Sequence, residues 1–225
     1  MGKKVNPRSF RLGYIYNWDG RWLNQKQYKG LLKQDHDLRK FLNSKLKEAS
    51  IEKIVIERLS NSIKVIIHTS RAGLIIGRGG TGIEELKVQL QKIIQKSLIT
   101  KNYQLKLEVQ EIRDPDTSAQ IVAQGVASQI ERRMPFRRIL KQTLDRVYQN
   151  KVIQGIKISV AGRLNGAEMS RTEWLSRGKI PLQTLRADVD FARSTAYTSY
   201  GSIGVKVWLY KGEVFGDKKE NERIN

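Results

Sequence analysis

The residues best suited to chemistry lie in a glycine-rich loop, Gly77-Arg78-Gly79-Gly80, in the first half of the chain. Glycines let a backbone come close to phosphate groups and adopt positive φ angles that side chains disfavour. Arg78 supplies a positive charge, and a helix predicted to begin at Thr81 would add the positive end of its dipole. Together these residues predict a loop that binds anions.

Three interpretations of this glycine-rich loop are possible from its residues. Gly77 to Gly82 fit G-x-G-x-x-G, but that dinucleotide-binding pattern follows a buried strand and precedes an acidic residue by about 20 positions. Here no such strand fits before the loop, and no acidic residue stands near Asn102. The second interpretation is a KH module, whose G-x-x-G loop clamps about four nucleotides. The third is a tight turn that needs glycine only for its shape, and the basic chain favours the KH interpretation over it.

A second candidate surface is a basic helix predicted to begin near Pro135. The cations on it and just before it are Arg132, Arg133, Arg137, Arg138, Lys141 and Arg146. Arg137, Arg138 and Lys141 lie within roughly a quarter-turn of one another, given the helical period of about 3.6 residues. Only two acidic residues of the same segment oppose these cations, so the segment is predicted to contact RNA phosphates.

A catalytic or metal site is not predicted. Asp188 and Asp190 stand two apart on an expected strand and point to the same side, which would suit Mg²⁺ in a nuclease. Such a pair more often neutralises neighbouring cations, here Arg186 and Arg193. The chain has no cysteine, its two histidines are far apart in sequence, and no spacing pairs a nucleophile with a base. No cofactor and no small-molecule substrate is therefore expected.

The charge balance points to a polyanionic partner. The 225 residues include 42 Lys and Arg against 22 Asp and Glu, a formal net charge of +20. Such an excess opposes compaction unless a polyanion lies nearby, and nucleic acid is the obvious one. No apolar run approaches the roughly 20 residues that span a bilayer, and residues 1–11 lack the apolar run of a secretory signal. The chain is expected to be soluble and intracellular, with no membrane partner.

The first half of the chain predicts an α+β domain. Its expected elements are a helix over 26–49, strands over 53–59 and 63–68, the glycine loop, a helix from 81 and a strand over 104–112. Ser60-Asn61-Ser62 would turn the chain between the first two strands. Thr81 with Glu84 fits a capping box. The second helix would bury Ile83, Leu86, Leu90, Ile93, Ile94 and Leu98.

The second half predicts a sheet covered by two helices. Residues 114–117, Asp-Pro-Asp-Thr, mark a boundary, and Thr117 with Gln120 fits a second capping pair. One helix then has a narrow face of small residues, and the next is the basic helix. Alternating apolar residues predict strands around 156–160, 168–174, 185–191 and 205–209. These strands contain three aromatic residues that are expected in the core, Trp174, Trp208 and Tyr210.

Several segments form a pattern that covers almost the whole chain. They are Gly2–Pro7, Ile54–Arg58, Gly162–Glu168, Arg171–Trp174, Pro181–Ala187 and Tyr200–Trp208. Together they resemble the small-subunit ribosomal protein family conventionally called S-three, of bacterial or organellar type. The last four segments are highly specific in combination.

The resemblance implies an α+β fold of two domains. Residues 26–113 would form an N-terminal type II KH RNA-binding domain. Residues 114–215 would form a C-terminal domain with two helices on a mostly antiparallel four-stranded sheet. An N-terminal extension over 1–25 and a short polar tail over 216–225 would flank them.

The resemblance also implies a function and partners. The chain would be a structural constituent of the small-subunit head, on the cytoplasmic ribosome of a bacterium or on an organellar ribosome. It would contact small-subunit ribosomal RNA, messenger RNA and the neighbouring small-subunit proteins ten and fourteen. Arg137, Arg138 and Lys141 would line the channel of incoming messenger RNA and help to open its secondary structure. The residues predicted to bind RNA are Gly77, Arg78, Gly79, Gly80, Arg132, Arg133, Arg137, Arg138, Lys141 and Arg163.

The main alternative is a free KH-domain protein that regulates selected messengers. The second half disfavours it, because cations spread over many segments suit embedding in a large RNA better than one short site. The chain departs from the family in its glycine loop. Many members carry a second basic residue where this chain has Gly79, which predicts a weaker grip on phosphate.

Overall fold

The computed structural model describes residues 4–59, 62–96 and 103–215, and the chain forms two compact units. The first unit is Trp18–Arg113, and the second unit combines Met1–Asn17 with Asp114–Asn225. The stretch 1–25, expected as a single extension, is thus divided between the two units. Three predicted features lie outside the described residues: the turn at Ser60 and Asn61, the burial of Leu98 and the tail over 216–225.

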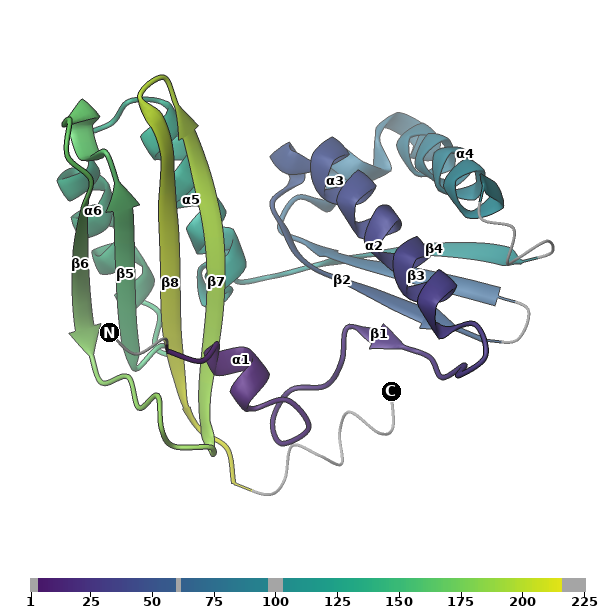
Figure 1. Cartoon of the computed structure of the whole chain (residues 1–225), viewed down its shortest axis with the longest axis horizontal. Coiled ribbons are helices and arrows are strands. Elements are labelled where there is room, and N and C mark those ends of the chain that lie inside the picture. Colours follow the sequence, from purple (N-terminus) through teal and green to yellow (C-terminus); the bar gives the residue numbers. More distant parts are fainter. Residues whose placement is uncertain (1–3, 60–61, 97–102, 216–225) are drawn as a thin grey trace. The chain divides into compact units, whose positions relative to one another are not determined.

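The first unit is a mixed sheet with helices on one face (Figure 1). Its strands follow the order β1 (Gly20–Arg21), β2 (Ile51–Arg58), β3 (Ser62–Thr69) and β4 (Gln104–Glu111). Strands β2 and β3 are antiparallel, while the β1–β2 and β3–β4 pairs are parallel. The helices and short 3-10 turns are α2 (Tyr28–Lys45), Lys47–Ala49, α3 (Ala72–Ile76), Arg78–Gly80 and α4 (Thr81–Lys96).

Apolar periodicity predicted most of this unit correctly. Leu38 and Leu42 of α2, Ile56 of β2 and Leu90 of α4 meet in one buried core. Helix α3 and the two-residue strand β1 are elements that the sequence did not reveal, and for α3 the reason is its length. It has five residues and contains a glycine, so it is too short to show a helical period.

A buried polar network ties β1 to the helices of the first unit. The Arg58 Nε donates to Asp35 Oδ1 at 3.0 Å, and the Arg58 Nη1 donates to Gln34 Oε1 at 2.9 Å. The Trp22 Nε1 donates to Asp35 Oδ2 at 2.7 Å. Asp35 of α2 therefore accepts hydrogen bonds from both Trp22 and Arg58, and these bonds fix the segment after β1 against α2 and β2.

The second unit is a fully antiparallel sheet covered on one face by two helices, as Figure 1 shows. Its strand order is β6 (Arg171–Gly178), β5 (Gly155–Gly162), β8 (Gly201–Glu213) and β7 (Ala187–Thr198). The two covering helices are α5 (Ala119–Glu131) and α6 (Phe136–Tyr148). Short helical segments are α1 (Pro7–Phe10), Pro115–Thr117 and Leu164–Gly166. The expected two-helix, four-stranded architecture is confirmed.

Small side chains set the position of α5 on this sheet. Ala119, Ala123 and Ala127 are buried on its inner face, where the sequence predicted a narrow stripe. Helix α5 packs on β7 and β8, while α6 packs on β5 and β6. Because alanine lets backbones approach closely, α5 lies tight on the sheet, and the larger Ile139 and Val147 fill the space under α6.

Both predicted capping pairs are wrong. Thr81 already has helical dihedral angles, and its hydroxyl donates to the Arg78 carbonyl at 3.1 Å. The Thr117 hydroxyl donates to the Asp114 carbonyl at 2.7 Å, and α5 begins two residues later. The Ala119 N–H, which has no partner within the helix, donates to Asp190 Oδ2 of β7 at 2.9 Å, so Asp190 caps the start of α5.

The two aspartates of β7 consequently do not form a cation site together. Asp188 accepts from the Tyr16 hydroxyl at 2.5 Å, whereas Asp190 caps α5. The expected neutralisation of Arg186 and Arg193 by these aspartates is also wrong, because Arg186 pairs with Glu213 at 2.5 Å and Arg193 forms no ion pair with a described residue. Within the described ranges, no group of three or more His, Asp or Glu is placed to hold a metal ion.

Arg11 anchors the N-terminal segment to the second unit. Its side chain is fully buried, and its Nη2 donates to the carbonyls of Pro181, Leu182 and Thr184 at 3.1, 3.0 and 2.9 Å. Burial lowers the pKa of the Arg11 guanidinium, and the nearby Tyr16 and Asp188 partly offset this shift. The guanidinium thereby shapes the loop between β6 and β7. None of the helices in the described part of the chain is long and apolar enough to cross a membrane.

Candidate nucleic-acid interface

The glycine loop connects α3 to α4 through three left-handed backbone positions. Gly77, Gly79 and Gly80 have φ angles of 70°, 62° and 84°. Residues with side chains rarely adopt such angles, so the sequence pattern and the backbone agree. Arg78 lies between them, is exposed and forms no ion pair with any residue that the structure describes.

The glycines of this loop divide into two kinds. A Cβ on Gly77 would lie 3.0 Å from the Gly82 nitrogen, and a Cβ on Gly82 would lie 2.6 Å from the Ile75 carbonyl oxygen. These two glycines are needed for the close approach of α3 and α4. A Cβ on Gly79 or Gly80 would meet no atom within 4 Å. The shape of the turn therefore accounts for Gly77, while Gly79 and Gly80 border open space beside Arg78.

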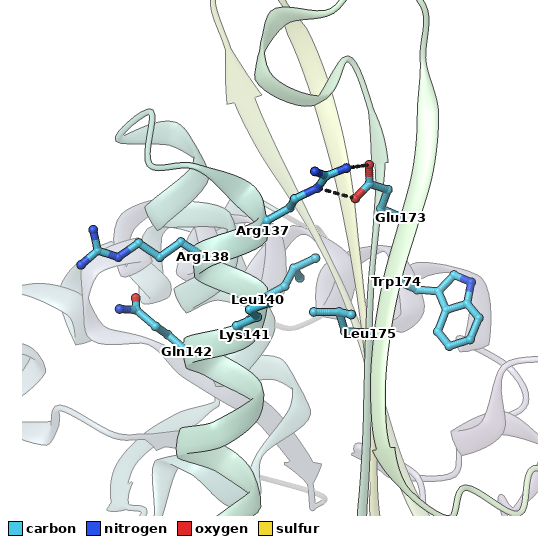
Figure 2. A pocket seen from close by; sticks show the side chains of 8 residues that line it. All are labelled: Arg137, Arg138, Leu140, Lys141, Gln142, Glu173, Trp174 and Leu175. Atoms are coloured by element: carbon cyan, nitrogen blue, oxygen red, sulfur yellow. Dashed lines mark hydrogen bonds and ion pairs between the residues drawn. The ribbon is translucent and has the colours of Figure 1, made fainter.

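The basic face of α6 is exposed because its apolar residues bury the opposite side. Pro135 precedes the first helical residue, and Phe136, Ile139 and Leu140 are buried against the sheet. Arg137, Arg138 and Lys141 all remain exposed, as the helical period predicted. Figure 2 shows the Arg137 side chain reaching toward Glu173 of β6, whereas the Arg138 side chain extends from α6 away from β6.

A groove beside α6 and β6 has a volume of about 530 Å³. It is lined by Arg137, Arg138, Leu140, Lys141, Gln142, Glu173, Trp174 and Leu175. Two hydrogen bonds of 3.4 Å join the Arg137 guanidinium to the Glu173 carboxylate, although the Arg137 side chain is 72% exposed (Figure 2). Arg138 and Lys141 form no ion pair with any described residue.

Contacts with other elements change the charge balance that the sequence indicated. Arg146 pairs with Asp116 at 3.2 Å, and Asp145 of the same helix pairs with Arg177 at 3.0 Å. Glu131 accepts from the Tyr197 N–H at 2.9 Å. Counting charges along one helix missed these contacts, because the partners are distant in sequence. Within the described residues, the cations of this region without an ion pair are Arg132, Arg133, Arg138 and Lys141.

Arg132 and Arg133 form the exposed corner between α5 and α6. Arg132 is the C-cap residue that follows α5, and Arg133 has a left-handed φ of 61°, which turns the chain toward Pro135. Arg133 also borders a second cavity of about 270 Å³, together with Arg163. The corner therefore continues the basic surface of α6 beyond the start of the helix.

The Arg163 side chain is half-buried, and it already donates hydrogen bonds within the protein. Its Nε donates to the Ala167 carbonyl at 2.9 Å, and its Nη1 donates to the Tyr200 carbonyl at 3.3 Å. The guanidinium lies 5.8 Å from the centre of the Tyr200 ring. These contacts hold the Leu164–Gly166 turn, so Arg163 has fewer free donors than the cations of α6.

Trp174 was expected in the core, and this expectation is wrong. Its side chain is 56% exposed, and it points away from α6 on the other side of β6 (Figure 2). Trp208 is half-buried, and only Tyr210 is buried as predicted. The alternation of β6 is too weak in sequence to distinguish its two faces, because Trp174 stands between Glu173 and Leu175.

Two family models match the chain. The model described as KH domain matches residues 37–117, which contain the glycine loop. The model described as Ribosomal protein S3, C-terminal domain matches residues 126–209, which contain the basic face of α6. Each match thus covers one of the two candidate RNA surfaces.

Similar proteins from several bacteria match along nearly their whole length. A protein of Desulfitobacterium hafniense is 49% identical over 219 residues, which cover 97% of this chain and 96% of the relative. One of Syntrophomonas wolfei is 46% identical and one of Carboxydothermus hydrogenoformans is 47% identical, over 99% and 98% of this chain and 95% and 96% of the relatives. All three are named small ribosomal subunit protein uS3.

Proposed function

Because this chain belongs to the family of small ribosomal subunit protein uS3, we propose that it is a structural constituent of the small ribosomal subunit that binds ribosomal RNA. Its excess of positive charge supports this role, since a net charge of +20 is stabilised by a surrounding polyanion. We place the chain in the head of the subunit, next to small-subunit proteins ten and fourteen, as the family resemblance implies.

The finer part of the proposal concerns messenger RNA. Arg138 and Lys141 are exposed, co-facial and without an ion pair among the described residues, and this observation carries the proposal. With Arg137 they line the groove beside β6 and hold the phosphates of incoming messenger RNA. They act through charge and do not read bases, because lysine and arginine side chains on a phosphate backbone carry no sequence information. The family resemblance implies that these residues also help to open the secondary structure of the messenger.

The glycine loop is the second proposed phosphate contact. Arg78 is exposed next to Gly79 and Gly80, whose positions leave open space for a ligand. The loop leads directly into α4, whose N-terminal end attracts anions. Gly77 supports this contact indirectly, by allowing α3 to approach Gly82.

A catalytic role forms no part of the proposal. The family is one of ribosomal structural proteins, and the only carboxylate pair considered for catalysis, Asp188 and Asp190, serves Tyr16 and α5 instead. The relatives named above are bacterial, so we place the chain on a bacterial-type ribosome.

Sedimentation of a cell lysate tests the ribosomal role. The chain is expected to travel with the small subunit in a sucrose gradient, one copy per particle, and to remain there after a high-salt wash. Retention follows from burial within folded RNA, since exposed charge contacts alone weaken steeply with salt. A chain that stays near the top of the gradient, away from ribosomal RNA, would instead support the free KH regulator.

A further inference from the structure

The second unit has a sheet face that neither α5 nor α6 covers. Helices α5 and α6 occupy one face, and the other is turned toward the viewer in Figure 1. Ile156, Ile158 and Val160 of β5 point into the core, so the alternate positions of that strand lie on the uncovered face. At one end of this face, Ile180 and Leu182 pack against Val189 and Tyr210, so that end is covered.

The pairing register identifies the residues of the remaining part, here called the open sheet face. Two rows cross all four strands from β7 to β6. The first row is Phe191, Trp208, Lys157 and Ser176, and the second row is Arg193, Lys206, Ser159 and Trp174. These eight positions include three aromatic residues, three cations and no acidic residue.

The aromatic residues of this face form a connected platform. The Trp208 and Phe191 ring centres are 5.2 Å apart. The Lys157 Nζ lies 4.4 Å from the centre of the Trp174 ring and 5.7 Å from that of Trp208. Lys157 therefore bridges the two tryptophans, and Trp174 presents most of its surface to solvent.

Two cations of this face repel each other, which lowers the stability of the sheet when nothing is bound. Arg193 and Lys206 stand directly opposite each other in the β7–β8 register, and both are exposed. Like charges directly opposite on neighbouring strands destabilise a sheet. Neither forms an ion pair with a described residue, so an anion bound between them would relieve the repulsion.

We propose that the open sheet face is a further RNA contact, which stacks unpaired bases on Trp174 and Trp208 and holds their phosphates with Lys157, Lys206 and Arg193. A flat aromatic surface with cations and without carboxylates has the chemistry of single-stranded RNA binding. An apolar protein partner would bury three cations without a counter-charge. The contact shares Trp174 with the lining of the α6 groove, but its other residues lie on the face of the sheet opposite α6.

Binding of the full chain to an unstructured single-stranded RNA of about ten nucleotides tests the proposal. Trp174→Leu keeps an apolar side chain but removes the ring, and it is expected to weaken binding on the order of tenfold, as loss of one stacked base does. Trp174→Phe should restore most of the affinity. Tyr28→Leu, which changes another exposed aromatic residue in the first unit, serves as the matched control and should leave the affinity unchanged.

The same measurement in a chain with Arg137, Arg138 and Lys141 changed to glutamine separates this contact from the α6 groove. The relative loss caused by Trp174→Leu should be the same in both backgrounds. Equal affinities of Trp174→Leu and the unchanged chain would overturn the proposal. So would an equal loss of binding to oligoglutamate of the same length, because that polymer offers charge and no bases.

Discussion

Replacing Arg137, Arg138 and Lys141 by alanine is expected to make RNA binding markedly less dependent on salt. Each phosphate contact to single-stranded RNA releases counterions and contributes about 0.7 to the slope of log K against log salt. Arg137 is already paired with Glu173, so the loss should correspond to between two and three contacts. The slope should therefore fall by about 1.4 to 2.1, measured by titration of single-stranded RNA at several salt concentrations.

A charge-preserving variant is the matched control for this prediction. Arg137→Lys, Arg138→Lys and Lys141→Arg together keep every positive charge on α6 while changing the shape of each side chain. This variant should retain the slope, because phosphate contacts through charge do not require one donor geometry. A slope that stays unchanged in the alanine variant would remove α6 from the RNA interface.

Changing Arg78 and Gly79 to aspartate together is expected to weaken RNA binding by at least about tenfold. The change replaces a cation by an anion and adds a second anion beside the phosphate path, and like-charge juxtaposition costs several kcal/mol. Aspartate can be accommodated at Gly79, because its φ of 62° is one that Asp and Asn tolerate and its Cβ meets no atom within 4 Å. Affinity for single-stranded RNA and thermal unfolding of the same samples are the two measurements.

Arg78→Asn with Gly79→Asn is the control for the aspartate variant. Asparagine has nearly the same shape as aspartate and no charge, so any effect of the altered turn appears in both variants. Binding should be substantially stronger with asparagine than with aspartate, and both chains should unfold at similar temperatures. If both variants unfold early and bind equally weakly, the loop is a structural turn and not a phosphate clamp.

Much of the fold could be predicted because it depends on regular apolar spacing. The alanine stripe of α5 repeats every four residues, and the alternation of Ile156, Ile158 and Val160 marks one buried face of a strand. In long, regular segments of this kind, every repeat of the apolar spacing indicates the same secondary structure and the same buried face. Helix α3 and strand β6 lack such repetition, so the sequence missed the first and misplaced the faces of the second.

The contacts between distant residues could not be predicted. Asp190 caps α5 across 71 positions of sequence, and Arg11 reaches carbonyls more than 160 positions away. A capping pattern of neighbouring residues, such as Thr117 with Gln120, was therefore overruled by a tertiary contact. Ion pairs could not be predicted for the same reason, since Glu173, the partner of Arg137, belongs to another element.

The candidate site was predicted in part from residue type alone. The exposure of Arg137, Arg138 and Lys141 follows from helical periodicity, and the positive φ angles of the loop follow from its glycines. Which of the cations lack an intramolecular partner depends on the folded chain. Arg163, for example, is occupied by two carbonyl groups that no spacing in the sequence reveals.

Photocrosslinking at position 138 in assembled small subunits tests the central proposal most directly. A photoreactive amino acid in place of Arg138 should crosslink to messenger RNA ahead of the codon being decoded, since Arg138 borders the groove and has no ion-pair partner among the described residues. The same group in place of Asp37, an exposed acidic residue of α2, is the control and should give much less messenger product. Crosslinks at position 138 to ribosomal RNA alone, in subunits that hold messenger normally, would contradict a role for this groove in guiding messenger RNA.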